Sequence, residues 1–297
     1  MKDLGRLITA MVTPFDGRGK VDYAQANKLA LACLKSGSDG VVLSGTTGES
    51  PTLTHKEELK LYAEVKAAVG KRGSVIAGTG SNSTAEAVEA TQAAEKVGVD
   101  AALLVTPYYN KPSQEGLYQH FKAIAENTGL PCILYNVPGR TVVSLAAETV
   151  IKLSEIKNII GIKEASANLE EIGKIISGSK KGFLVWSGND SDVLPLMKMG
   201  GYGVISVISH LVGLQMKDYM NKYQAGKVAE ADKIYMSLMP LIKAMFIVSN
   251  PVPVKYALNQ IGFNVGQPRL PLVEPDAKSA AFIKETLKLY EIDLPLD

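Results

Sequence analysis

The sequence predicts an α/β protein built as a closed (β/α)8 TIM barrel with a C-terminal helical extension. Eight short runs of mostly apolar residues recur along the chain, and each ends in glycine or polar residues. Segments with apolar residues three and four positions apart, typical of helices, lie between successive runs. The length of 297 residues is within the usual range for one barrel. We therefore expect residues 1–209 to form the barrel and residues 210–297 to form the helical region.

The eight apolar runs are nearly continuous rather than alternating, as strands buried on both faces of a parallel sheet require. An open doubly wound sheet is the alternative, but no glycine fingerprint of the dinucleotide-binding type follows the first run. The count of eight favours closure into a barrel. The expected strands are residues 7–14, 40–45, 74–80, 101–107, 132–138, 159–166, 184–190 and 203–209.

Helix entries are marked by residues that cap backbone N–H groups. Thr54 with Glu57 has the spacing of a capping box, and Thr84 also marks a helix start. The expected helices between the strands are residues 23–36, 56–69, 85–97, 115–128, 144–153, 169–177 and 190–199. In the extension they are residues 214–224, 228–247, 253–260 and 276–291.

Composition excludes several classes of protein. The formal charge is +2, from 32 basic and 30 acidic residues, which argues against a nucleic-acid or anionic-membrane partner. No apolar run reaches the roughly 18 residues of a membrane span, and the first residues lack the pattern of a secretory signal. Cys33 and Cys132 are typical of reduced core thiols in a cytoplasmic protein. The three histidines, His55, His120 and His210, lack metal-ligand spacing, so we expect no metal and no cofactor.

Lys163 is the most informative residue, because it lies in an otherwise apolar expected strand. The active site of such a barrel is built at the C-terminal ends of its strands. Burial there favours the neutral amine, which can attack a carbonyl and form an imine. The alternative is a strand-end lysine whose ammonium reaches solvent. Side chains alternate along a strand, so Ile162 and Glu164 should point away from the face of Lys163, and Gly161 should leave room beside it.

Other strand ends carry polar groups suited to the same chemistry. Tyr135 and Tyr109 supply phenols that can transfer protons, although core packing would also explain them. Thr46 and Thr47, between glycines, could hold a carboxylate or simply cap a turn. Arg140, on a turn after proline and glycine, could bind a second carboxylate in bidentate fashion or be an exposed turn residue.

Taken together, these motifs resemble those of the pyruvate-dependent class I aldolases, the N-acetylneuraminate lyase family. The resemblance extends over essentially the whole chain, and several separated motifs in order are more specific than any one. The motifs are Gly45-Thr46-Thr47-Gly48-Glu49, Tyr108-Tyr109, Tyr135-Asn136-Val137-Pro138-Gly139-Arg140, Gly161-Ile162-Lys163-Glu164, Asn250-Pro251-Val252-Pro253-Val254-Lys255 and Arg269-Leu270-Pro271-Leu272.

The resemblance implies a lyase in which Lys163 forms a Schiff base with pyruvate. It further implies that Tyr135 relays protons together with Thr47 and Tyr109. In the family, the phenol matching Tyr109 comes from a neighbouring subunit, so a homodimer is the smallest active unit and is usually paired into a homotetramer. The substrate-binding residues implied by the match are Thr46, Thr47, Arg140, Gly188 and Ile205.

Arg140 favours one reaction within the family. A carboxylate-bearing aldehyde gives an arginine at this position a partner, whereas a sugar chain does not. The resemblance thus implies condensation of pyruvate with L-aspartate 4-semialdehyde to 4-hydroxy-tetrahydrodipicolinate, the first committed step of lysine (diaminopimelate) biosynthesis. Two alternatives stay open. One is a related aldolase acting on 2-keto-3-deoxy sugar acids or 4-hydroxy-2-oxo acids, and the other is a non-catalytic 2-oxo-acid binding protein.

The resemblance also implies an effector pocket for lysine at the dimer contact. Glu58 departs from the family pattern there, because strongly inhibited relatives carry a histidine at this position. The strength of any feedback inhibition therefore does not follow from the sequence. The positions that match the pocket are Ser50, His55, Asn82, Glu86 and Tyr108.

Overall fold

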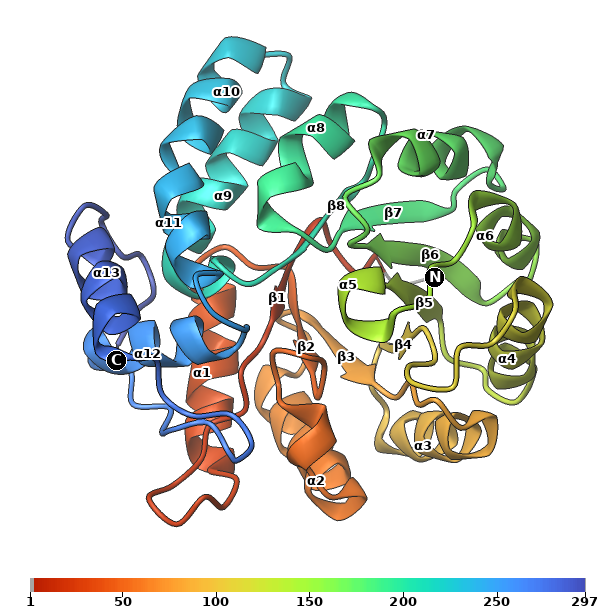
Figure 1. The fold of residues 1–297 in the computed structure, drawn as a ribbon, viewed down its shortest axis with the longest axis horizontal. Helices are drawn as coiled ribbons and strands as arrows, with labels where there is room; N and C mark the ends of the chain where they lie inside the picture. The colour runs from red at the N-terminus through yellow and green to blue at the C-terminus, as the bar shows by residue number, and fades with distance from the viewer. Residues whose placement is uncertain (1–2, 297) are drawn as a thin grey trace. The chain divides into compact units, whose positions relative to one another are not determined.

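The computed structural model describes residues 3–296, and its eight parallel strands form a closed barrel in chain order (Figure 1). The predicted fold class is confirmed. Every expected strand is present, but each ends two to four residues before its predicted end, because the last residues of each run turn into loops. The strands are β1 Leu7–Ala10, β2 Gly40–Leu43, β3 Ser74–Gly78, β4 Ala101–Val105, β5 Cys132–Asn136, β6 Ile159–Glu164, β7 Leu184–Ser187 and β8 Gly203–Ser206.

Helices follow the strands as predicted, with small corrections at their ends. Thr54 and Glu57 form the expected capping box. Ser83, rather than Thr84, caps the next helix, since its hydroxyl accepts the N–H of Glu86. The helix expected at residues 190–199 is a 3-10 turn, η2 Asp190–Asp192, followed by α8 Val193–Lys198. The remaining elements are α1 Tyr23–Lys35, η1 Ser50–Thr52, α2 His55–Val69, α3 Thr84–Val97, α4 Gln114–Glu126, α5 Pro138–Thr141, α6 Ala147–Ser154 and α7 Leu169–Gly178.

After β8 the chain is helical. The single helix expected at residues 228–247 is instead two helices, because Pro240 lacks a backbone N–H and stands at the start of the second. None of the helices in residues 3–296 is long and apolar enough to span a bilayer. The helices of this region are α9 Ser209–Gln224, α10 Val228–Ser237, α11 Met239–Met245, α12 Val252–Gln260 and α13 Ala277–Leu287.

The packing of the chain divides it into two compact units, which cut across the predicted boundary at residue 209. The first unit contains residues 3–6 and Ile76–Ile205, and the second contains Leu7–Val75 and residues 206–296. The predicted division into residues 1–209 and 210–297 stays a prediction.

In the first unit, helices α3, α4, α6 and α7 lie outside strands β4–β7 (Figure 1). Tyr135 on β5 and Trp186 on β7 are the register partners of Lys163 on β6. A β-carbon at Gly161 would lie 2.7 Å from Trp186 Cζ3 and 2.3 Å from the Leu184 carbonyl oxygen. The expectation that Gly161 leaves room beside Lys163 is therefore wrong, because the indole and the neighbouring strand occupy that space.

In the second unit, α9 carries a buried histidine that binds the segment after β1. The His210 Nε2 accepts the Val12 N–H at 3.2 Å, and Nδ1 lies 2.7 Å from the Val207 carbonyl oxygen. Burial lowers the pKa of His210 to about 4, so the neutral ring can accept one hydrogen bond and donate the other.

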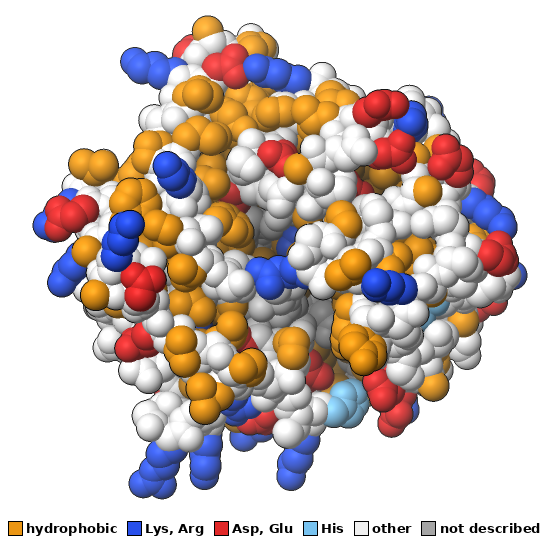
Figure 2. All heavy atoms as spheres, in the orientation of Figure 1, with side chains coloured by type: hydrophobic (Ala, Val, Ile, Leu, Met, Phe, Trp, Pro, Cys, Tyr) orange, Lys and Arg blue, Asp and Glu red, His pale blue; other side chains and the backbone are white. Residues whose placement is uncertain are grey.

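Hydrophobic side chains gather on the outer surface over α9–α11 (Figure 2). The large exposed ones there are Leu214, Val228, Met236, Phe246 and Ile247.

Both cysteines are core residues, as predicted. Cys33 and Cys132 are buried and form no disulfide. Burial raises the pKa of each thiol to about 12, which keeps both protonated and unreactive near neutral pH.

Candidate active site

Lys163 is buried at the end of β6 next to a phenol. Only 5% of its surface is exposed, and its Nζ lies 4.3 Å from the centroid of the Tyr135 ring. The Tyr135 carbonyl oxygen accepts both the N–H and the hydroxyl of Thr106 at 2.9 Å, which ties β5 to the end of β4. The structure thus brings together the predicted imine-forming amine and the predicted proton carrier on neighbouring strands.

Gly188 provides the space beside the lysine. A β-carbon there would lie 3.2 Å from Lys163 Cε and 2.6 Å from Ala165 Cβ. The Gly188 N–H donates to the Glu164 carbonyl oxygen at 2.7 Å, which fixes the loop after β7 against the end of β6. Any side chain at this position would therefore crowd the aliphatic part of Lys163.

Asn136 and Glu164 form a buried bridge whose role was not predicted from the sequence. The Asn136 Nδ2 donates to the two Glu164 carboxylate oxygens at 3.0 and 3.2 Å, and its Oδ1 accepts the Leu145 N–H at 3.0 Å. Burial raises the pKa of Glu164, opposed by its bonds from Ser166 and Asn136. As expected, the carboxylate is engaged away from Lys163. The bridge fixes the segment that carries Arg140 to the end of β6.

Arg140 and Ile205 occupy contrasting positions. Arg140 is exposed on the short helix α5, where its backbone N–H donates to the Val137 carbonyl oxygen at 2.9 Å. Ile205 is fully buried in β8. Arg140 thus lies at the surface, whereas Ile205 can contribute only to an apolar wall.

Tyr109 projects from the loop after β4 with 90% of its surface exposed. Pro112 favours extended backbone at the residue before it, but Tyr109 and Lys111 both have left-handed backbone, with φ of 73° and 47°. The loop is braced at Asn82, whose Nδ2 donates to the Tyr108 carbonyl oxygen at 3.0 Å. Asn110 Nδ2 in turn donates to the Asn82 carbonyl oxygen at 2.8 Å.

Thr46 and Thr47 belong to the second unit, in the turn after β2. The Thr47 side chain is buried, and its hydroxyl oxygen accepts the Nδ2 of Asn250 at 2.9 Å. The Thr13 hydroxyl donates to the Gly48 carbonyl oxygen at 2.6 Å. Thr46 is half-buried. The turn thus carries one buried hydroxyl, that of Thr47, and one partly accessible hydroxyl, that of Thr46.

A fully buried ion pair lies directly after this turn, and sequence reasoning missed it. The Lys255 ammonium donates to Glu49 Oε1 at 2.8 Å and to the carbonyl oxygens of Thr13 and Gln267 at 3.0 and 3.2 Å. The Arg269 N–H donates to the other Glu49 oxygen at 2.9 Å. Burial lowers the pKa of Lys255 to about 8, although Glu49 opposes that shift. The available signal was a single charged residue in each of two otherwise uncharged motifs.

The proposed effector residues are divided between the two units. Ser50 and His55 lie in the second, whereas Asn82, Glu86 and Tyr108 lie in the first. Glu86 accepts the Ser81 hydroxyl at 2.9 Å.

Glu58 departs from the family pattern. Its Oε2 lies 3.9 Å from Nδ1 of His55. Burial is the main cause that raises the pKa of Glu58 to about 8, and the nearby charge of Glu57 adds to this shift. The carboxyl group is therefore largely protonated near neutral pH.

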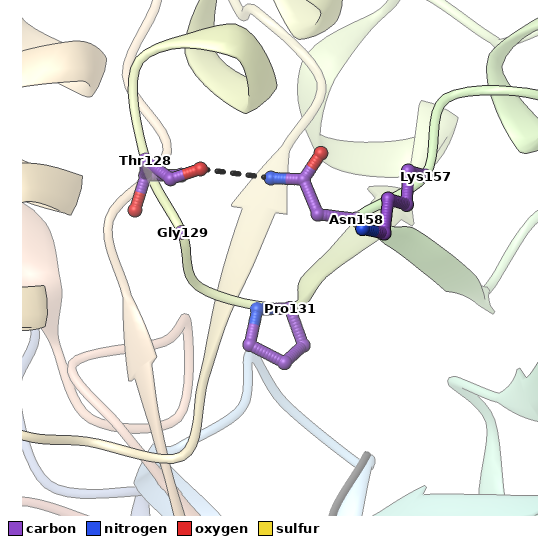
Figure 3. Close-up of a pocket in the computed structure, with 5 residues that line it drawn as sticks. All are labelled: Thr128, Gly129, Pro131, Lys157 and Asn158. Carbon is purple, nitrogen blue, oxygen red and sulfur yellow. Dashed lines mark hydrogen bonds between the residues drawn. The ribbon is translucent and has the colours of Figure 1, made fainter.

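A recess of about 370 Å³ lies at the opposite, N-terminal ends of β5 and β6 (Figure 3). It contains none of the predicted site residues. The Asn158 amide is already used there, since it donates to three backbone carbonyl oxygens, one of them that of Thr128 at 3.1 Å. The recess is lined by Thr128, Gly129, Pro131, Lys157 and Asn158.

Within residues 3–296, no three His, Cys, Asp or Glu side chains are grouped so as to hold a metal ion.

Comparison with known proteins identifies the family. The family model described as the dihydrodipicolinate synthetase family matches residues 3–289. A 4-hydroxy-tetrahydrodipicolinate synthase from Dehalococcoides mccartyi (strain CBDB1) is 64% identical over 296 residues, covering 100% of both chains. One from Moorella thermoacetica is 54% identical over 286 residues, covering 95% of this chain and 98% of the relative.

Solved structures of similar proteins have the same fold. A dihydrodipicolinate synthase from Bacillus anthracis has a TM-score of 0.96 at 45% identity, covering 98% of this chain and 100% of the other. One from Cyanidioschyzon merolae with lysine bound has a TM-score of 0.95 at 45% identity, covering 96% and 97%. Full-length similarity at this level of identity establishes the family. The chain belongs to the dihydrodipicolinate synthetase family.

Proposed function

We propose that this protein is a lyase that condenses pyruvate with L-aspartate 4-semialdehyde to form 4-hydroxy-tetrahydrodipicolinate. The observation that carries the proposal is the buried amine of Lys163, 4.3 Å from the Tyr135 ring centroid. A desolvated amine beside a phenol is suited to imine formation with a 2-oxo acid. The names of full-length relatives at up to 64% identity support this substrate pair.

The reaction follows from the chemistry of an imine. The Lys163 amine attacks the ketone carbon of pyruvate, and the carbonyl oxygen leaves as water after protonation. Loss of a methyl proton gives an enamine, whose carbon attacks the aldehyde. The amino group of the second substrate then attacks the imine carbon, closes the ring and releases Lys163. Because the iminium accepts the electrons left by proton loss, this route requires no cofactor.

The surrounding residues have roles in this proposal that fit their positions. Tyr135 transfers protons during imine formation and ring closure, coupled to Thr47. Thr46 and Thr47 hold the pyruvate carboxylate through hydroxyl and backbone donors. Arg140, exposed on α5, binds the carboxylate of the semialdehyde. The further residues of the pocket wall are Gly188 and Ile205.

An oligomer is part of the proposal. Tyr109 is 90% exposed on a braced loop, a suitable position for a phenol that completes the site of a neighbouring subunit. We propose a homodimer as the smallest active unit, with pairing into a homotetramer. We also propose that the protein acts in the cytoplasm, since its two cysteines are buried thiols rather than a disulfide.

An effector site for lysine is the final part of the proposal. The residues are Ser50, His55, Asn82, Glu86 and Tyr108. One family member of known structure has lysine bound. Glu58, with its raised pKa, places a mostly neutral carboxyl group beside His55 near pH 7.

A direct assay tests the proposed reaction. Purified protein is incubated with pyruvate and L-aspartate 4-semialdehyde, and the loss of both substrates and the appearance of the cyclic product are followed by mass spectrometry. We expect consumption of the two substrates in equal amounts, and no consumption with Lys163→Ala. Cleavage of 2-keto-3-deoxy sugar acids or 4-hydroxy-2-oxo acids, without turnover of the semialdehyde, would assign a related aldolase activity instead. Binding of pyruvate without turnover of any aldehyde would indicate a binding protein.

A further inference from the structure

A side chain from the C-terminal region contacts the proposed pyruvate-binding turn directly. Asn250, between α11 and α12, donates its Nδ2 hydrogen to the Thr47 hydroxyl oxygen at 2.9 Å, although the two residues are 203 positions apart in sequence. Both side chains are buried. A hydrogen bond in such a dry environment holds a fixed direction better than one exposed to water.

The direction of this bond determines what the Thr47 hydroxyl can do. A hydroxyl group has one hydrogen to donate and accepts through its oxygen. Because the Asn250 N–H approaches that oxygen, the Thr47 hydrogen must point away from Asn250 and towards another acceptor. We propose that Asn250 is a positioning residue, which orients the Thr47 hydroxyl so that its hydrogen is donated to the carboxylate of the bound 2-oxo acid. This inference rests on the proposed function.

The turn itself has other supports, so the effect of Asn250 on the hydroxyl can be separated from an effect on the loop. The Thr13 hydroxyl holds the Gly48 carbonyl oxygen at 2.6 Å. Lys255 and the Arg269 N–H hold the two oxygens of Glu49 at 2.8 and 2.9 Å. Loss of Asn250 should therefore leave the backbone of the turn in place and free only the rotation of the hydroxyl.

Trapping of pyruvate on Lys163 by borohydride tests the proposal without requiring turnover. The pyruvate concentration needed for half-maximal trapping is measured by mass spectrometry for wild type, Asn250→Ala, Thr47→Val and the double variant. Valine keeps the shape of threonine but removes the hydroxyl. We expect Asn250→Ala to raise this concentration about tenfold, which corresponds to the loss of one oriented hydrogen bond. We expect the double variant to match Thr47→Val, because no hydroxyl is left to orient.

Two further variants separate orientation from packing. Asn250→Leu keeps the branched shape of the side chain but removes its N–H donor, and we expect it to bind pyruvate as poorly as Asn250→Ala. Asn259→Ala is the matched control, since Asn259 lies in the same region and its amide binds only backbone, the Val265 N–H and the Gly266 carbonyl oxygen. It should lower thermal stability and leave the pyruvate dependence unchanged.

The outcomes are distinct. Three results would overturn the positioning role. Asn250→Ala or Asn250→Leu could trap pyruvate at the same concentration as wild type. Alternatively, Asn250→Ala could raise the required pyruvate concentration by the same factor in the presence and in the absence of the Thr47 hydroxyl. Failure of the wild-type protein to trap pyruvate on Lys163 would instead overturn the proposed function, and the inference with it.

Discussion

A β-carbon at Gly188 would lie 3.2 Å from Cε of Lys163, so the loop after β7 limits the space around the reactive amine. Gly188→Ala should displace the Lys163 side chain, because the added carbon would crowd Cε of Lys163. The same carbon would also lie 2.6 Å from Ala165 Cβ, so the loop has to shift as well. We expect turnover to fall about tenfold or more and stability by about 1–3 kcal/mol. Gly17→Ala is the control, since a β-carbon there meets no atom within 4 Å. Equal kinetics for the two variants would show that this space is not needed.

Arg140 should determine affinity for the second substrate. Arg140→Ala should remove the proposed bidentate contact with the substrate carboxylate, and such a charged contact typically contributes about 2–4 kcal/mol, or roughly 30–1,000-fold. We therefore expect the KM for L-aspartate 4-semialdehyde to rise far more than the KM for pyruvate. Arg140→Lys should recover only part of the loss, because an ammonium lacks the planar fork. Similar changes in both KM values in steady-state assays would indicate that Arg140 only supports the turn.

Tyr109 should act in the active site of the neighbouring subunit. Mixing two inactive variants, Tyr109→Phe and Lys163→Ala, gives mixed dimers in which one site carries both changes and the other carries neither. With random exchange, about a quarter of wild-type activity should return. Native mass spectrometry of tagged chains must first show that mixed dimers form. If they form and activity stays absent, Tyr109 acts within its own chain.

Glu58 should make stability fall as pH rises. Its folded pKa of about 8 exceeds the unfolded value of about 4.3, so the folded protein binds more protons between these values. The contribution of Glu58 to stability is then greatest at low pH and declines as pH rises through this window. Glu58→Gln should remove roughly 2 kcal/mol of this decline between about pH 5 and about pH 9.

Urea unfolding of both proteins at several pH values measures the Glu58 effect. Glu126→Gln, on an exposed carboxyl group of α4, is the control and should leave the wild-type pH dependence unchanged. Parallel curves for wild type and Glu58→Gln would contradict the raised pKa.

Much of the fold could be predicted because it depends on local patterns. Nearly continuous apolar runs predicted all eight strands, and capping residues such as Thr54 predicted helix starts. Strand ends were placed too late because apolar residues continue into the loops, as at Thr106-Pro107 after β4. A single helix at residues 228–247 was expected because the apolar pattern continues through Pro240, which begins a new helix.

The site was predictable only in part for a similar reason. Lys163 and Tyr135 could be singled out because each stands at the end of a recognisable strand. The bond between Asn250 and Thr47 joins residues 203 positions apart, and the pair of Lys255 and Glu49 spans 206 positions. Periodicity within one element carries no information about which distant loop it meets. The space beside Lys163 was likewise assigned to Gly161, although Trp186 fills that position.

The most direct test of the central claim is reduction with borohydride in the presence of pyruvate, followed by peptide mass spectrometry. An imine between the buried Lys163 amine and pyruvate should be reduced to a stable adduct on that residue alone. Lys255 is the internal control, because it is also a buried lysine but its ammonium is held by Glu49 and two carbonyl oxygens. We expect one pyruvate-derived group per chain, on Lys163, and none on Lys163→Ala. An adduct on another lysine, or no adduct at all, would contradict the claim.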